Sequence, residues 1–159
     1  MYYSIGNALG KLNDFKNAII NFDKALEINP KYAEAYYNRG IAYSDLNEFH
    51  NAIRNFERAV IINPKYAEAY YNIGNSYFSL KDYQNAIRNY DRALKFNPKN
   101  DEAYYNKGLA FCDMKEFYHA INSFDSAIEI NPNLGDAYCN RGIAYVSLGD
   151  YQNGLLSYN

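Results

Sequence analysis

The residue types that most often carry chemistry in proteins are scarce in this chain of 159 residues. Its two histidines, His50 and His119, have no cysteine or carboxylate neighbours at the spacing of a metal site. Cys112 and Cys139 stand in a chain with no other sign of secretion, so we expect free thiols. The glycines form no phosphate-binding loop. We therefore expect no enzyme activity, no catalytic residues, no cofactor and no bound metal ion.

The composition argues against two classes of partner, nucleic acids and membranes. The formal net charge is −2 and the isoelectric point is about 5.7, whereas a general nucleic-acid binder normally carries a basic stripe. No apolar run approaches the roughly 18 residues of a membrane span. The first residues lack the basic and apolar regions of a signal peptide. We expect a cytoplasmic protein, or a fragment whose targeting segment is missing, with no nucleic-acid partner and no membrane span.

One spacing recurs throughout the sequence. The four prolines each follow an asparagine and lie 34 residues apart, at Pro30, Pro64, Pro98 and Pro132. Glycine keeps the same spacing at Gly6, Gly40, Gly74, Gly108 and Gly142. Agreement at so many positions indicates a tandem repeat, and the repeat decides the fold.

Each repeat reads as two helices, and residues 33–66 illustrate the pattern. Tyr36, Gly40 and Tyr43 lie at helical spacing in the first half, and small and aromatic residues do so in the second half. The second helix is expected to end near Asn63, because proline disfavours the α conformation in the residue before it. Helices of about 13 residues are marginal alone in water, so the hairpins must bury their apolar faces on one another.

These residues resemble the tetratricopeptide repeat (TPR). The aromatic, glycine, tyrosine, alanine and proline positions of that pattern are matched by Tyr36, Gly40, Tyr43, Ala52, Phe56, Ala59 and Pro64, and again in the next two repeats. The resemblance implies an all-α fold, an α-solenoid of antiparallel helix hairpins in a right-handed superhelix. We expect a single array over residues 1–159, with a partial repeat at 1–32, full repeats at 33–66, 67–100 and 101–134, and a partial repeat at 135–159.

The last repeat departs from the pattern. Gly154 stands where alanine is usual, and no polar capping helix follows. Stacked repeats normally need a solvating terminal unit. We therefore expect part of a longer array, with an exposed apolar end that favours end-to-end self-association. That end is formed by Tyr151, Leu155, Leu156 and Tyr158.

The resemblance also implies where a ligand binds. In the family, the first helix of each hairpin lines the concave side. Mapped onto this chain, the candidate peptide-binding residues are Tyr37, Asn38, Ile41, Glu68, Tyr71, Asn72, Asn75, Phe78, Glu102, Tyr105, Asn106, Leu109 and Asn140.

Within this set, one asparagine recurs in each of the four repeats from residue 33 onward. We call Asn38, Asn72, Asn106 and Asn140 the asparagine ladder. An amide side chain both donates and accepts hydrogen bonds, so a row of them can hold a peptide backbone of any sequence. The row looks like the asparagine ladder of the O-linked N-acetylglucosamine transferase superhelix. The alternative is that these asparagines are generic solvated residues of the repeat.

Acidic residues recur along one edge of the same surface. They are Glu34, Glu68, Glu102 and Asp136. A negative groove prefers basic or neutral ligands, although acidic residues near a helix start are also explained by the helix dipole. Some family members hold the carboxylate tail of a chaperone with lysines and an arginine. In this chain the lysine positions carry Tyr37 or Tyr71 and Glu102 or Asp136, and the arginine position carries Asn106 or Asn140. These residues lack the positive charge that a carboxylate needs, which argues against that ligand.

The sequence thus predicts a non-catalytic scaffold that binds a peptide or an extended protein segment. Two alternatives stay open, namely a self-assembly module and the regulatory TPR part of a larger enzyme. Arg39, Lys107 and Arg141 occupy a position where the family often has leucine, so ion pairs with a neighbouring hairpin are a further expectation.

Overall fold

The computed structural model describes residues 1–157, and its regular elements there are all α-helices. The helices are α1 (Tyr2–Lys11), α2 (Phe15–Ile28), α3 (Ala33–Asp45), α4 (Phe49–Ile62), α5 (Ala67–Ser79), α6 (Tyr83–Phe96), α7 (Asp101–Asp113), α8 (Phe117–Ile130), α9 (Gly135–Ser147) and α10 (Tyr151–Leu156). They form two compact units. The first, Met1–Lys81, holds α1 to α5, and the second begins at Asp82 and holds α6 to α10.

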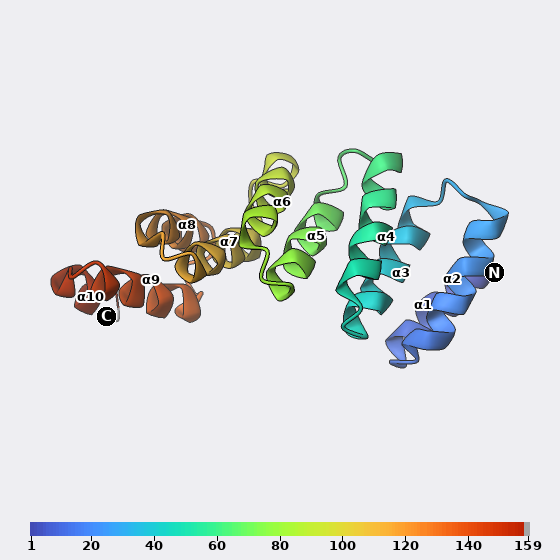
Figure 1. Cartoon of the computed structure of the whole chain (residues 1–159), viewed down its shortest axis with the longest axis horizontal. Helices are drawn as coiled ribbons and strands as arrows, with labels where there is room; N and C mark the ends of the chain where they lie inside the picture. Colours follow the sequence, from blue (N-terminus) through green and yellow to red (C-terminus); the bar gives the residue numbers. More distant parts are fainter. Residues whose placement is uncertain (158–159) are drawn as a thin grey trace. The chain divides into compact units, whose positions relative to one another are not determined.

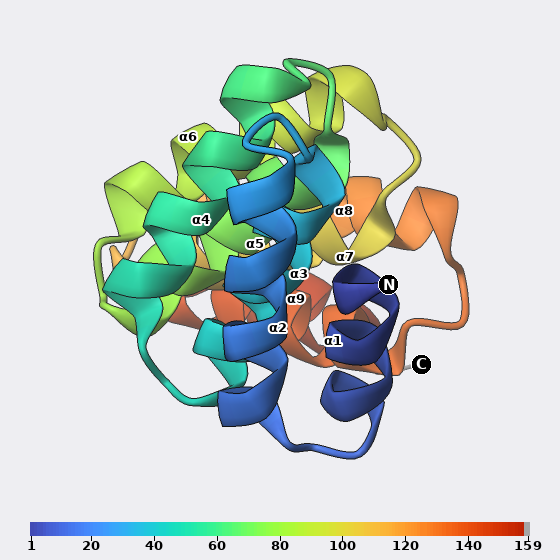
Figure 2. The same ribbon diagram turned by 90° about the vertical axis from the view of Figure 1, so that its right-hand side faces the viewer.

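Within each unit, a helix packs mainly on the helices next to it in the chain. In the first unit α1 packs on α2, α2 on α3, α3 on α4 and α4 on α5, and in the second unit the same chain of contacts runs from α6 to α10 (Figure 1). Figure 2 shows α1 and α2 side by side as one hairpin. Contacts also join successive first helices, α1 with α3, α3 with α5, and α7 with α9. The predicted all-α fold of stacked helical hairpins is confirmed.

Local sequence signals fix the ends of the helices. α4 ends at Ile62, and Asn63 before the proline is extended, as predicted. The turn from α3 to α4 is a Schellman motif, in which the Asn47 amide donates to the Ser44 carbonyl at 2.8 Å and the Glu48 amide donates to the Tyr43 carbonyl at 2.8 Å. Asn47 has the left-handed φ of 58° that this motif requires. The same conformation recurs in the corresponding turns at Asn13, Lys81, Lys115 and Gly149.

The core of a hairpin is a close contact between a glycine and a phenylalanine ring. A Cβ atom placed on Gly40 would lie 2.6 Å from the Phe56 ring, which is fully buried. Ala52 on the same helix as Phe56 is also fully buried. The contact recurs between Gly6 and Phe22 and between Gly108 and Phe124. The absence of a side chain at the glycine therefore lets the two helices of a hairpin approach closely.

Ion pairs join each of three first helices to the hairpin before it, as the sequence predicted. Arg39 pairs with Asp23, Lys107 with Asp91 at 2.6 Å, and Arg141 with Asp125 at 2.7 Å. The three basic side chains are about four-fifths buried, with exposed fractions of 20%, 21% and 19%. The methylene groups of these lysine and arginine side chains cover apolar surface while their charged ends reach a carboxylate. A basic residue can therefore stand at a position where the family often has leucine.

The last helix exposes the apolar residues expected at the end of the array. The exposed fractions are 71% for Tyr151, 71% for Leu155 and 62% for Leu156. The fourth residue of that prediction, Tyr158, lies outside the described residues. None of the helices between residues 1 and 157 is long and apolar enough to span a membrane.

A pair of alanine substitutions tests the role of the glycine contact. Gly40→Ala should lower the free energy of unfolding by about 1–3 kcal/mol, since the added methyl group would overlap the Phe56 ring. Gly10→Ala is the matched control, because a Cβ there meets nothing within 4 Å and alanine favours the helix by roughly 1 kcal/mol. Urea denaturation followed by circular dichroism measures both. Equal stability of the two variants would contradict this account of the core.

Candidate functional site

The sequence-predicted binding residues fall into two groups, one in each unit. The first unit holds Tyr37, Asn38 and Ile41 on α3, with Glu68, Tyr71, Asn72, Asn75 and Phe78 on α5. The second unit holds Glu102, Tyr105, Asn106 and Leu109 on α7, with Asn140 on α9. Since α3 contacts α5 and α7 contacts α9, each group lies on adjacent first helices.

The ladder asparagines Asn38, Asn72 and Asn140 are hydrogen-bonded to tyrosines of the preceding repeat. The Asn72 side-chain nitrogen donates to the Tyr37 hydroxyl at 2.9 Å. The same bond joins Asn38 to Tyr3 at 3.0 Å and Asn140 to Tyr105 at 3.0 Å. Each bond links residues 35 positions apart and so connects successive first helices. The ladder therefore also helps to hold one hairpin on the next.

The tyrosines in these pairs are fixed by ring contacts. The Tyr37 ring centre lies 5.7 Å from that of Phe56 and 4.8 Å from that of Tyr66. Tyr105 lies 5.8 Å from Phe124 in the same way. Burial raises the pKa of Tyr37, and the nearby Glu68 carboxylate raises it further, while the bond from Asn72 lowers it. The hydroxyl thus stays protonated at neutral pH and serves as a rigid hydrogen-bonding group.

These bonds engage the nitrogen of the amide rather than its oxygen. Asn38 donates a second bond to Asn7 at 2.9 Å, and Asn140 donates one to the Asp136 carbonyl at 3.0 Å. In each of these contacts the asparagine is the donor, and its side-chain oxygen takes no part. An amide oxygen accepts hydrogen bonds from N–H groups. The asparagines of these pairs therefore suit a ligand that needs acceptors, where the sequence had suggested donors as well.

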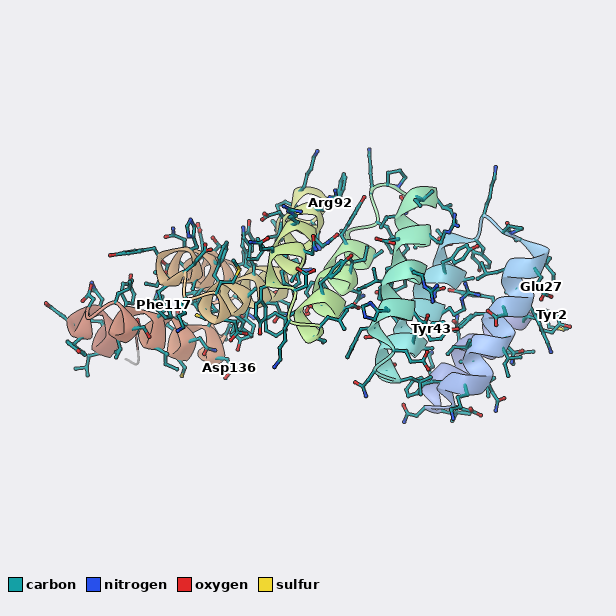
Figure 3. The ribbon with its side chains drawn as sticks, viewed as in Figure 1. Tyr2, Glu27, Tyr43, Arg92, Phe117 and Asp136 are labelled. Carbon is teal, nitrogen blue, oxygen red and sulfur yellow. The ribbon has the colours of Figure 1, made fainter. Side chains whose placement is uncertain are left out.

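The remaining predicted residues differ in their exposure. Ile41 and Leu109 are partly buried and pack against the hydrophobic cores of their units. Glu68 and Glu102 are exposed in the first turns of α5 and α7. Asp136, which is labelled in Figure 3, lies in the first turn of α9. The other predicted side chains are half-buried, and they are Tyr71, Asn75, Phe78 and Asn106.

The first unit contains a cavity that the sequence analysis did not predict. It has a volume of about 360 Å³ and lies beside Gly10, and we call it the Gly10 hollow. Its lining comprises Asn7, Gly10, Lys11, Phe15, Phe22, Asn38, Ile41, Ala42 and Asp45. A Cβ on Gly10 would meet nothing within 4 Å, so the missing side chain itself opens the space. The sequence did contain a signal, because Gly10 occupies the position that Ser44 holds one repeat later and lacks a side chain there.

The Gly10 hollow combines an apolar floor with both signs of charge. Phe15, Phe22 and Ile41 supply apolar surface, whereas Lys11 and Asp45 supply a cation and a carboxylate. Burial raises the pKa of Asp45. This part of the first-helix surface is therefore less uniformly acidic than the edge formed by Glu34 and the corresponding acidic residues.

The described residues hold no group of three or more histidine, cysteine, aspartate or glutamate side chains arranged to bind a metal ion. Cys112 and Cys139 are free thiols, as predicted. Burial raises the pKa of Cys112 to about 11, and the Asp113 carboxylate adds to this. The thiol is therefore protonated at neutral pH and is a poor nucleophile.

Comparison with known proteins agrees with this architecture. Family models of the tetratricopeptide repeat match residues 33–66, 67–100 and 101–134, and further models of the same repeat match 6–47 and 123–155. A search of the curated proteins gave no significant match.

Solved structures give the same result for the fold. A crystal structure of MamA is 30% identical with a TM-score of 0.93, covering 97% of this chain and 90% of its own. MamA from Desulfovibrio magneticus RS-1 is 20% identical with a TM-score of 0.92, and the match covers 99% of this chain and 89% of that MamA chain. YrrB, described as a TPR protein with an unusual peptide-binding site, is 26% identical with a TM-score of 0.85, covering 98% and 80%. With its repeats matched over most of its length, the chain belongs to the tetratricopeptide repeat family.

Proposed function

We propose that this protein is a non-catalytic scaffold that holds an extended protein segment against the faces of its first helices. TPR proteins are typically interaction scaffolds rather than enzymes. The observation that carries the proposal is the repeated tyrosine–asparagine pair, in which the amide nitrogen donates to a tyrosine hydroxyl and the amide oxygen takes no part in the bond. The similarity to YrrB, whose peptide-binding site is named in its description, supports the same interpretation.

The proposed chemistry of recognition is largely independent of ligand sequence. The side-chain oxygens of Asn38 and Asn72 would accept backbone N–H groups of the bound segment, which every residue except proline supplies. Exposed carboxylates such as Glu34 and Glu68 favour a basic or neutral segment through charge complementarity. The positions of the chaperone-tail clamp carry no cation, which argues against a carboxylate terminus as the ligand.

The Gly10 hollow would supply a preference for one side chain of the ligand. At about 360 Å³ it is at the small end of the roughly 300–1,000 Å³ range of ligand pockets, so it has room for a large side chain. Its floor of Phe15, Phe22 and Ile41 favours an apolar or aromatic group. We propose that the bound segment places such an anchor residue beside Gly10.

Two substitutions separate the structural role of the tyrosine–asparagine pair from its role in binding. Tyr37→Phe and Asn72→Ala each remove the same internal hydrogen bond, so both should lower the free energy of unfolding by about 0.5–1.5 kcal/mol. Only Asn72→Ala also removes the acceptor oxygen. It should therefore weaken binding of peptides selected from a displayed random library more strongly than Tyr37→Phe, which releases the amide but keeps its acceptor oxygen. Fluorescence anisotropy measures the affinities.

Equal affinity of the two variants would remove the asparagine ladder from the proposed function. Urea denaturation of the same samples provides the control for folding, since the two variants should be destabilised alike. A larger loss of stability in Asn72→Ala alone would mean that the amide has a further structural role.

Filling the Gly10 hollow tests the anchor. Gly10→Leu places a side chain in open space and replaces glycine within a helix, so the fold should be retained. Binding of an anchored peptide should lose roughly 1.5–3 kcal/mol, the typical contribution of one buried large apolar side chain. Gly135→Leu is the control, because a Cβ atom placed on Gly135 also meets nothing within 4 Å, yet this residue lies outside the hollow. Unchanged affinity in Gly10→Leu would rule out the anchor.

The exposed end of α10 favours a second candidate function, which is self-assembly. Tyr151, Leu155 and Leu156 offer an apolar surface on which a second copy could stack. Replacing Leu155 and Leu156 with glutamate should abolish any concentration-dependent increase in sedimentation coefficient. Persistent association of this variant would place the self-association surface elsewhere.

A further inference from the structure

A second cavity opens on the other side of α3, and we call it the arginine pocket. Its volume is about 350 Å³, and its lining comprises Tyr36, Arg39, Tyr43, Asn51, Arg54, Asn55 and Arg58. Tyr43 is labelled in Figure 3. None of these residues lines the Gly10 hollow. On α3, Arg39 and Tyr43 each lie two positions from Ile41, which places them about 200° around the helix from it. The arginine pocket is thus distinct from the proposed peptide-binding surface.

The lining of this pocket is basic although the chain is acidic overall. It contains three arginines and no carboxylate. Arg39 is paired with Asp23, but neither Arg54 nor Arg58 has a carboxylate partner within residues 1–157. Arg54 and Arg58 lie one helical turn apart, and like charges at this spacing destabilise a helix. Two unneutralised guanidinium groups therefore stand at one pocket.

The third arginine is held rigidly at the same place. The Arg39 Nε group donates to the Asn55 side-chain oxygen at 2.7 Å, and Nη1 donates to Asp23. The guanidinium carbon lies 5.3 Å from the centre of the Tyr36 ring. Its side chain is only 20% exposed. A guanidinium group has five N–H donors, so three remain for a ligand after these two bonds.

Amide side chains organise the other wall of the pocket. Arg54 Nη2 donates to the Asn51 side-chain oxygen, and the Asn51 side-chain nitrogen donates to Glu48 at 2.6 Å. The buried Asn55 donates to the Asn51 carbonyl at 2.8 Å. These bonds connect Arg39 to Arg54 through two asparagines. The donors are thereby oriented before any ligand arrives, which reduces the entropy cost of binding.

Only one repeat carries all three arginines at these positions. Arg88 and Arg92 correspond to Arg54 and Arg58, but Ile73 stands in place of Arg39 and is 2% exposed. The arginine pocket is therefore not a general consequence of the repeat. The Arg88 and Arg92 pair offers a control with the same two charges.

We propose that the arginine pocket binds a phosphate monoester. A phosphate monoester carries a charge of about −1.5 to −2 at neutral pH and three acceptor oxygens, which matches several guanidinium groups at one place. A carboxylate has a single charge and two oxygens, and it satisfies one arginine. The pocket is larger than a phosphate group alone, and the rings of Tyr36 and Tyr43 supply surface for the organic part of the ester. This inference is independent of the proposed peptide-binding function.

The direct test is titration of the whole chain with small phosphates at constant ionic strength. The probes are inorganic phosphate, O-phosphoserine and O-phosphotyrosine, with glutamate as the carboxylate control. Two-dimensional nuclear magnetic resonance should show saturable shifts of the Arg39 Nε–H signal and of the Asn51 and Asn55 side-chain amides. Tighter binding of a phosphoamino acid than of inorganic phosphate would identify an esterified ligand. Binding of inorganic phosphate alone, or equal binding of glutamate, would overturn the proposal.

A matched pair of variants tests the location. Arg54→Gln with Arg58→Gln should weaken phosphoamino-acid binding by at least about tenfold, because two charged donors are lost from the pocket. Arg88→Gln with Arg92→Gln removes the same charge and should change the affinity by less than about twofold. Equal weakening by both pairs would mean that net charge alone attracts the anion, and the arginine pocket would not be a site. Circular dichroism confirms that each variant is folded.

Discussion

The structure depends on one close contact, in which a glycine of the first helix receives a phenylalanine ring of the second. At Gly40 there is no room for even a methyl group beside Phe56, and the same is true at Gly6 and Gly108. Helices of this length are marginal alone, so their stability comes from the surface that this approach buries. The contact recurs in three hairpins, where it sets how closely the two helices approach and leaves their outer faces free to vary.

Where one hairpin stacks on the next, polar contacts add to the apolar packing within each hairpin. The tyrosine–asparagine pairs and the ion pairs both reach back to the preceding hairpin, the first from Asn72 to Tyr37 and the second from Arg39 to Asp23. Both kinds of contact are partly buried, where an unpaired polar group would be costly. Side chains of the type that bind ligands thus have a structural task as well. A substitution in a tyrosine–asparagine pair or in an ion pair can therefore change both binding and stability, and the two effects have to be measured together.

The first unit presents two cavities of similar volume and different chemistry. The Gly10 hollow has a largely apolar floor and belongs to the surface of the first helices, whereas the arginine pocket is polar and carries three guanidinium groups. The two cavities share no lining residue, and Ile41 of α3 lines the first whereas Arg39 and Tyr43 of the same helix line the second. One short helix between two neighbours thus contributes to two separate cavities, while its buried alanines, such as Ala35 and Ala42, pack in the core.

The sequence alone determined the hairpins and their ends, since these depend on local signals. Proline after Asn63 ends α4, and the 34-residue spacing identifies the glycine and phenylalanine positions. The place of Arg39 in the repeat indicated an ion pair with a neighbouring hairpin, but it did not identify Asp23 as the partner. What the sequence left open was the partner of each polar group, because that depends on the register between hairpins. Only the tertiary structure decided that the nitrogen of Asn72 is engaged by Tyr37, that the missing side chain of Gly10 opens a cavity, and that Arg39, Arg54 and Arg58 meet at one pocket. These features arise where two helices pack, and no single stretch of sequence specifies the space between them.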